Sequence, residues 1–114
     1  MVDVMVIIRS GPEDVRRVAD GLRLCAAMLG MDRAPRIVHL DEGVKCLLPG
    51  ALQDSTNRDY LRTSADLAGI QVLVESLEEN CLRIEDLDPD LNITTIDIRG
   101  LAEMMAECSS TVTF

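Results

Sequence analysis

The chain has 114 residues, a formal net charge of −9 and 47% hydrophobic residues, but only 2% aromatic residues. This length suits one domain with one hydrophobic core. Tyr60 and Phe114 are the sole aromatic residues, so aliphatic side chains must fill that core. Nucleic-acid binding is excluded on the same grounds, because it requires a basic surface and stacking side chains. We therefore expect a single domain over residues 1–114 that binds no nucleic acid.

The chain also lacks the patterns of exported and metal-binding proteins. No apolar run is long enough to span a membrane, and residues 1–8 do not have the flanks of a signal peptide. We expect a cytoplasmic protein with no membrane contact, in which Cys25, Cys46, Cys81 and Cys108 are reduced thiols. These cysteines form no Cys-x-x-Cys motif, and His39 is the only histidine. The sequence therefore indicates no metal site and no cofactor.

The first half of the chain alternates strand and helix patterns. Residues 2–8 form an apolar run, which is typical of a strand buried on both faces of a parallel sheet. After a turn over residues 10–14, apolar residues at three- and four-residue spacing predict a helix over about 13–29, with Ser10 as its cap and Gly30 at its end. A strand over 36–40, a short helix over 41–48 and a long loop over 51–57 are expected to follow.

The second half continues this alternation. A helix over 58–68 leads to the stretch from Gly69 to Glu75, where Ile70, Val72 and Val74 alternate with other residues as in a buried strand. We then expect a short helix over 81–87, a strand over 92–96, a helix capped by Asp97, and a strand over 111–114. Strands separated by helices call for a parallel sheet. The predicted fold is a three-layer α/β sandwich: a five-stranded, mainly parallel, Rossmann-like sheet with helices on both faces.

Four segments of the sequence, taken in order, resemble the DsrE/DsrF/TusD family of small sulfur-relay proteins. They are Ile-Ile-Arg-Ser-Gly-Pro-Glu-Asp at 7–14, Gly-Leu-Arg-Leu-Cys-Ala-Ala-Met at 21–28, Asp-Glu-Gly-Val at 41–44, and Leu-Ala-Glu-Met-Met at 101–105 followed by Thr-Val-Thr-Phe at 111–114. The resemblance covers nearly the whole chain. It implies the DsrE-like form of the predicted sheet, assembly into dimers, trimers or hexamers, and, in catalytic members, a cysteine that carries sulfane sulfur as a persulfide.

Catalytic members of that family have a cysteine directly after the central strand, whereas this sequence has Glu75 there. Several subunits of the related hetero-oligomers also lack the cysteine. The resemblance therefore favours a non-catalytic subunit or binding module related to intracellular sulfur-relay and sulfur-oxidation proteins. The alternative is a sulfurtransferase that holds a persulfide on Cys81, six residues further on. A helix amino end at Cys81 would favour its thiolate, but the neighbouring acids oppose it.

Further candidate binding residues lie where the predicted strands end, which is where open α/β sheets place their ligands. Glu75 is either a binding carboxylate or a solvated acid, and His39 is either a proton shuttle or a structural residue. The turn at Ser10 and Gly11 offers backbone N–H donors to an anion. Asp41 opens the segment after the second strand.

Assembly is the remaining expectation. Helix faces that bear Met104, Met105 or residues 47–48 would remain partly exposed on a monomer and become buried between subunits. We expect a symmetric homo-oligomer, a trimer or hexamer by resemblance, with other sulfur-relay proteins as further partners.

Overall fold

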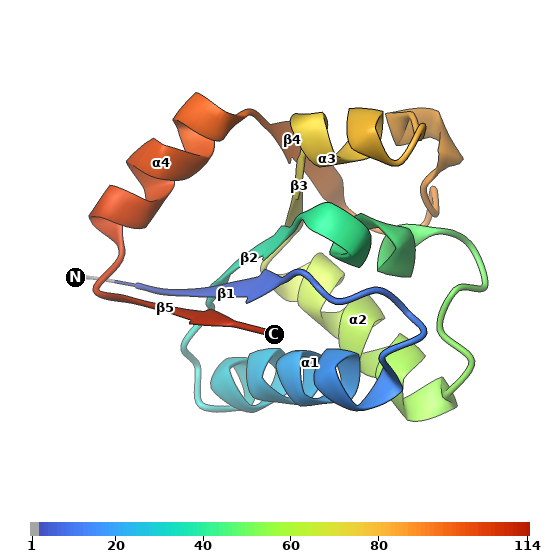
Figure 1. Ribbon diagram of the computed structural model, residues 1–114. Coiled ribbons are helices and arrows are strands. Elements are labelled where there is room, and N and C mark those ends of the chain that lie inside the picture. Colours follow the sequence, from blue (N-terminus) through green and yellow to red (C-terminus); the bar gives the residue numbers. More distant parts are fainter. Residues whose placement is uncertain (1–2) are drawn as a thin grey trace.

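A computed structural model describes residues 3–114, in which five strands form one sheet in the order β4-β3-β2-β1-β5 (Figure 1). All four strand pairings are parallel. The predicted α/β class and five-stranded sheet are therefore confirmed, and the sheet is parallel throughout. Residue 2, the first residue of the strand predicted over 2–8, lies outside the described residues. The strands are β1 (Val4–Ile8), β2 (Arg36–His39), β3 (Ile70–Leu73), β4 (Ile93–Ile96) and β5 (Ser110–Thr113).

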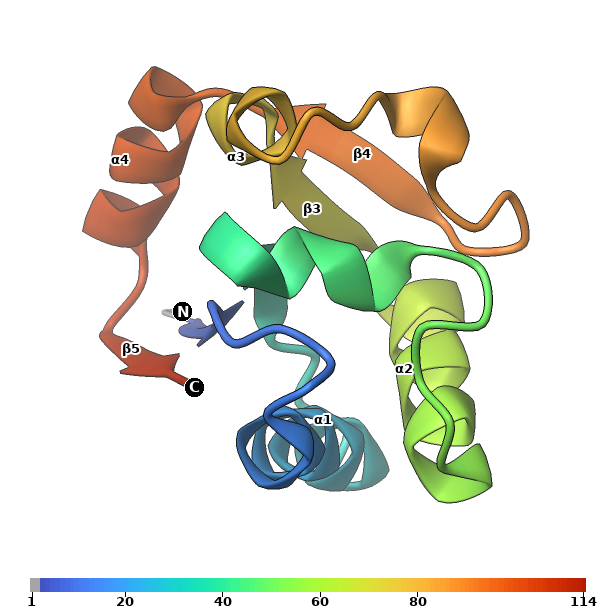
Figure 2. The ribbon, with the colours of Figure 1, turned by 45° about the vertical axis from the view of Figure 1, so that its right-hand side comes forward.

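Helices cover both faces of the sheet, as predicted. Helices α1 (Val15–Gly30) and α2 (Ser55–Leu67) pack on one face, and α4 (Ile98–Glu107) packs on the other (Figures 1 and 2). The chain proceeds from β1 to β4 in one direction, and α4 then returns it to the far side of β1. The shorter elements are the 3₁₀ helix η1 (Asp41–Leu47), α3 (Val74–Glu79) and the 3₁₀ helix η2 (Ile84–Asp86).

The alternation of side chains along β1 explains why the core has two parts. Val6 and Ile8 point into the larger cluster, which lies against α1 and α2, whereas Met5 and Ile7 point to the side of α4. All four side chains are buried, which confirms that this strand is apolar on both faces. The smaller cluster consists of Met5, Ile7, Val38 and Met104.

Two helices begin at positions that the sequence pattern did not indicate. The N-cap of α1 is Asp14 rather than Ser10, because the Asp14 carboxylate accepts a hydrogen bond from the backbone N–H three residues further on, at 3.5 Å. Asp54 caps α2 in the same way, at 3.0 Å. Helix α2 consequently starts at Ser55, within the stretch predicted to be a loop over 51–57.

The region after β3 also differs from the prediction. The strand ends at Leu73, and α3 occupies the positions from Val74 onward that the alternating pattern assigned to strand and polar loop. The side-chain oxygen of Ser76 accepts a hydrogen bond from the backbone N–H of Asp41 at 2.8 Å, which connects the first turn of α3 to the start of η1, just after β2. The short helix predicted over 81–87 is reduced to η2.

Candidate functional site

Asp41 joins the segments that follow β1, β2 and β3 at the carboxyl edge of the sheet. Its carboxylate accepts a hydrogen bond from the Arg9 guanidinium at 2.6 Å, and its backbone N–H donates to the Ser76 hydroxyl at 2.8 Å. The Asn80 side-chain amide donates to the Asp41 carbonyl oxygen at 3.1 Å and to the Ser76 carbonyl oxygen at 2.8 Å. The backbone of Asp41 has a φ of 52°, in the left-handed region. The polar residues of this edge therefore bond mainly to one another.

His39 lies at the end of β2 and is wholly buried. Its Nδ1 is 2.9 Å from the carbonyl oxygen of Gly43, which can only accept, so Nδ1 carries the proton and donates it. Its Nε2 is buried and has no hydrogen-bond partner among residues 3–114. Burial lowers the pKa of His39 to about 4, an effect that the hydrogen bond to Gly43 only partly opposes. The ring is therefore neutral at pH 7 and makes no contact with solvent.

Glu75 lies in the first turn of α3, and its carboxylate reaches the amino end of α4. Its Oε2 accepts a hydrogen bond from the backbone N–H of Ile98 at 3.3 Å. Its Oε1 is buried without a hydrogen-bond partner in the described part of the chain. The same helix end is capped by Asp97, as predicted, through the backbone N–H of Gly100 at 2.7 Å. A negative charge at a helix amino end is stabilising, so Glu75 acts here as a structural contact between α3 and α4.

This contact predicts the effect of removing the carboxylate. Glu75→Ala should lower the free energy of unfolding by about 1 kcal/mol. The substitution removes both the acceptor of the Ile98 N–H and the favourable negative charge at the amino end of α4. Glu78→Ala is the matched control, since Glu78 is an exposed residue of the same helix. Urea denaturation of both variants measures the difference. Equal destabilisation by the two substitutions would show that the bond to Ile98 contributes nothing.

The four thiols have different environments. Cys81 is exposed, in the turn after α3, with a φ of 57°, so it follows the carboxyl end of a helix rather than beginning one. Burial raises the pKa of Cys25 to about 12, and burial together with the nearby charge of Glu13 raises the pKa of Cys46 to about 12. Burial is also the main cause that raises the pKa of the half-buried Cys108. These three thiols are therefore protonated at neutral pH.

The turn after β1 uses much of its hydrogen-bonding capacity within the protein. The backbone N–H groups of Arg9 and Ser10 both donate to the carbonyl oxygen of Phe114, at 2.7 and 3.2 Å. The carbonyl oxygen of Ser10 accepts a hydrogen bond from the Cys46 thiol at 3.5 Å. Gly11 is buried. The donor of Ser10 that the sequence offered to an anion is thus already bonded.

The structure brings Asp41 and Glu75 to the same edge of the sheet but places the His39 ring in a separate, buried position. Asp41 contacts the α3 region that contains Glu75, whereas the His39 ring bonds to η1 beneath this edge. Ser76 and Asn80 were not predicted from the sequence. Nothing in the pattern of residues 75–80 indicates which of these side chains form hydrogen bonds with Asp41. Within residues 3–114, no group of three or more His, Cys, Asp or Glu residues could hold a metal ion. None of the helices described over this range is long and apolar enough to cross a membrane.

Comparison with known proteins identifies the fold. No protein-family model and no curated protein matches the sequence. Among solved structures, the crystal structure of the ychN protein from E. coli is similar to the whole chain: the two are 13% identical, 100% of each chain is covered, and the TM-score is 0.81. At this identity the likeness concerns the fold alone. The chain therefore has a YchN-like, Rossmann-like α/β fold.

Proposed function

We propose that this protein is a non-catalytic subunit or binding module of the DsrE-like type, related to sulfur-relay proteins. The observation that carries the proposal is the hydrogen bond between the Glu75 carboxylate and the backbone of α4. Glu75 lies just after β3, where the resemblance implies a reactive cysteine, and its carboxylate bonds to the amino end of α4. A side chain engaged in this way holds two helices together and carries no sulfur. The YchN-like fold supports the relationship to the family.

The environments of the thiols support the same conclusion. Sulfur transfer needs a thiolate, which attacks the outer sulfur of a donor persulfide, takes that sulfur in a new S–S bond and releases the donor thiolate. Cys25 and Cys46 are buried and held in the thiol form. Cys81 is exposed in the turn after α3 and does not lie at a helix amino end, where a thiolate would be stabilised.

A sulfur carrier based on Cys81 is the second candidate function. One observation favours it: Cys81 is exposed and directly follows Asn80, whose side chain belongs to the polar edge around Asp41. A donor bound at that edge would lie beside the thiol. Against it stands the position of Cys81, six residues beyond the place where the resemblance implies the reactive cysteine.

Exposure to a small persulfide donor, followed by intact-mass analysis, tests this choice. We expect the wild type to gain the mass of one sulfur atom slowly and incompletely, and Cys81→Ser to remove even that gain. Rapid, stoichiometric labelling of the wild type that Cys81→Ser abolishes would establish Cys81 as a sulfur carrier.

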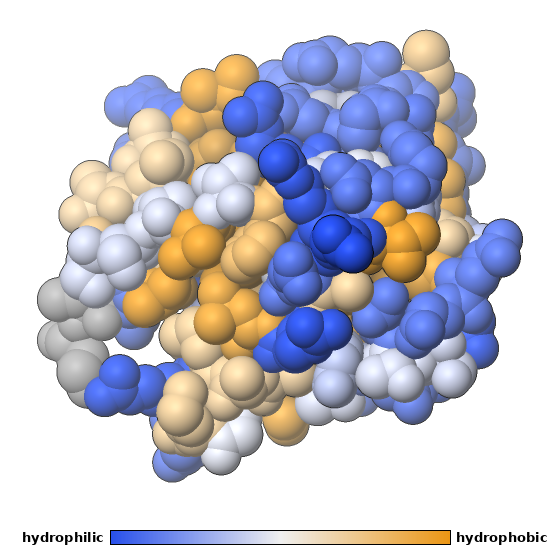
Figure 3. Space-filling view, turned by 60° about the horizontal axis from the view of Figure 1, so that its bottom comes forward, coloured by the Kyte–Doolittle hydropathy of each residue, from blue (hydrophilic) through white to orange (hydrophobic). Residues whose placement is uncertain are grey.

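The proposal includes assembly into a homo-oligomer. Large apolar side chains are exposed on α1, α2 and α4: Val15 by 59%, Leu67 by 66% and Ile98 by 58%. Figure 3 shows apolar patches set among hydrophilic residues on the face that includes the bottom of Figure 1, where α1 lies. Met105 is exposed as predicted, whereas Met104 and Leu47 pack into the core. Such patches support association between subunits.

Light scattering at micromolar concentrations is the measurement for assembly. We expect the mass of a trimer or hexamer. Replacing Ile98 and Leu67 with glutamate should shift the protein toward smaller species, whereas Glu103→Lys, an exposed substitution on α4, should not. A monomer throughout the concentration range would contradict the proposal.

A further inference from the structure

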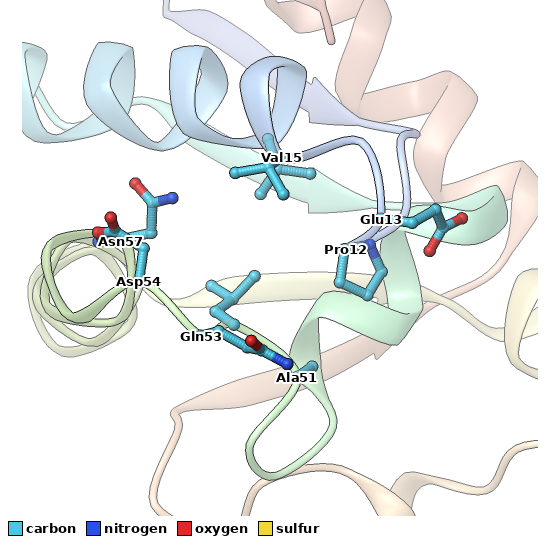
Figure 4. Close-up of a pocket in the computed structure, with 9 residues that line it drawn as sticks. Pro12, Glu13, Val15, Ala51, Gln53, Asp54 and Asn57 are labelled. Atoms are coloured by element: carbon cyan, nitrogen blue, oxygen red, sulfur yellow. Dashed lines mark hydrogen bonds between the residues drawn. The ribbon is translucent and has the colours of Figure 1, made fainter.

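A cavity of about 510 Å³ opens between the amino ends of α1 and α2 (Figure 4). Its volume falls within the range of roughly 300–1,000 Å³ that is usual for small-molecule sites. The stretch from Ala51 to Asp54, which connects η1 to α2, closes one side. Most of the wall is aliphatic. The apolar lining residues are Pro12, Val15, Val18, Ala51 and Leu52.

Asn57 is the buried polar residue that lines this cavity, whereas the other polar lining residues, Glu13, Gln53 and Asp54, are exposed. Asn57 is only 8% exposed, and its backbone N–H bonds to Asp54, but its side-chain amide forms no hydrogen bond with any residue of 3–114. Figure 4 shows the amide extending from α2 toward α1, across from Val15. The amide is open to the cavity rather than sealed inside the protein, so its hydrogen-bond partners can come from a molecule bound there. A bound molecule with a matching donor and acceptor would supply those partners.

The charges around the cavity determine which ligands suit it. Two helix amino ends border it, and each already holds the carboxylate of its own cap, Asp14 on α1 and Asp54 on α2. Glu13 adds a third carboxylate to the lining, although its side chain turns away from Asn57 in Figure 4. No lysine or arginine lines the cavity. An anion would meet net negative charge here, so the cavity suits an uncharged molecule.

We propose that this cavity binds an uncharged planar heterocycle of the nucleobase class, with the Asn57 amide paired to an adjacent donor and acceptor on its edge. An asparagine amide makes such a paired contact with the N6 and N7 atoms of adenine. The aliphatic walls contact the faces of the ring. The groove continues between α1 and α2, past Arg16 and Arg23, as far as Tyr60, which leaves room for a substituent. This inference does not depend on whether Cys81 carries sulfur.

Adenine, titrated into the full chain and followed by ¹H–¹⁵N and methyl NMR, tests the proposal. We expect saturable shifts of the Asn57 side-chain amide and the Val15 and Val18 methyl groups. Asn57→Leu should weaken binding by about tenfold or more, because the paired contact is lost. Benzoate, a planar anion of similar size, should bind more weakly than adenine.

Two further variants keep the test decisive if Asn57→Leu folds poorly. Ala51→Trp should fill the cavity and abolish the shifts, whereas Ala102→Trp, at an exposed position on α4, should leave them unchanged. The proposal is overturned if adenine produces no saturable shift at about 10 mM. Equal binding by wild type and Ala51→Trp, or tighter binding of benzoate than of adenine, would overturn it as well.

Discussion

Gly43→Ala is expected to lower the free energy of unfolding by about 3 kcal/mol or more. A Cβ at Gly43 would lie 2.0 Å from the carbonyl oxygen of Ile8 and 2.7 Å from its carbonyl carbon. Both are backbone atoms of β1, so no side-chain rotation relieves the overlap. Moving η1 away from β1 would also break the hydrogen bond between His39 and the Gly43 carbonyl.

Urea denaturation of Gly43→Ala and of a matched control measures this effect. The control is Gly30→Ala at the end of α1, where an added Cβ meets nothing within 4 Å. We expect that control to be neutral or slightly stabilising, because alanine is the better helix former. Equal stability of the two variants would show that η1 does not approach the backbone of β1 as closely as the structure indicates.

The stability of the protein should fall as the pH decreases from about 6.5 to 4, by roughly 3 kcal/mol from His39 alone. The pKa of His39 is lowered from 6.5 to about 4 in the folded state. Between these values the unfolded chain binds a proton on this residue and the folded chain does not, so acid favours unfolding. The contribution is fully present above the unfolded value and is lost progressively toward the folded one.

Comparison with His39→Gln isolates this contribution. The variant should be less stable at pH 7, because the buried ring and its packing are lost, but its stability should depend less on pH between 6.5 and 4. Carboxylates that titrate at the acid end are common to both proteins and cancel in the difference. Parallel stability curves for wild type and variant would show that His39 is accessible to protons in the folded state.

The sheet could be predicted from sequence because its strands have strong local patterns. The apolar run of β1 and the alternation through Ile70 and Val72 are short-range features, and helical spacing between them implies a parallel arrangement. The boundaries were less accurate because several residues nearby can cap a helix. Ser10 and Asp14 are both good caps, and only the backbone of the turn decides that Asp14 is used.

The candidate site was predictable only in position. The carboxyl ends of parallel strands identify the edge where Asp41 and Glu75 lie. What each side chain does there depends on residues distant in sequence. The partner of Glu75 is Ile98, in the helix that crosses to the other side of β1, and the burial of His39 depends on the glycine that lets η1 approach. No local pattern encodes these contacts.

The central claim is that Glu75 replaces the sulfur-carrying cysteine. It is tested most directly by comparing sulfur loading of the wild type with that of the double variant Glu75→Cys, Cys81→Ser. Both proteins are exposed to the same persulfide donor and their intact masses are compared. A cysteine at position 75 would lie in the first turn of α3, where a thiolate is favoured. We predict that the variant gains one sulfur atom and that the wild type gains little. Rapid and complete loading of the wild type, with none in the variant, would contradict the account.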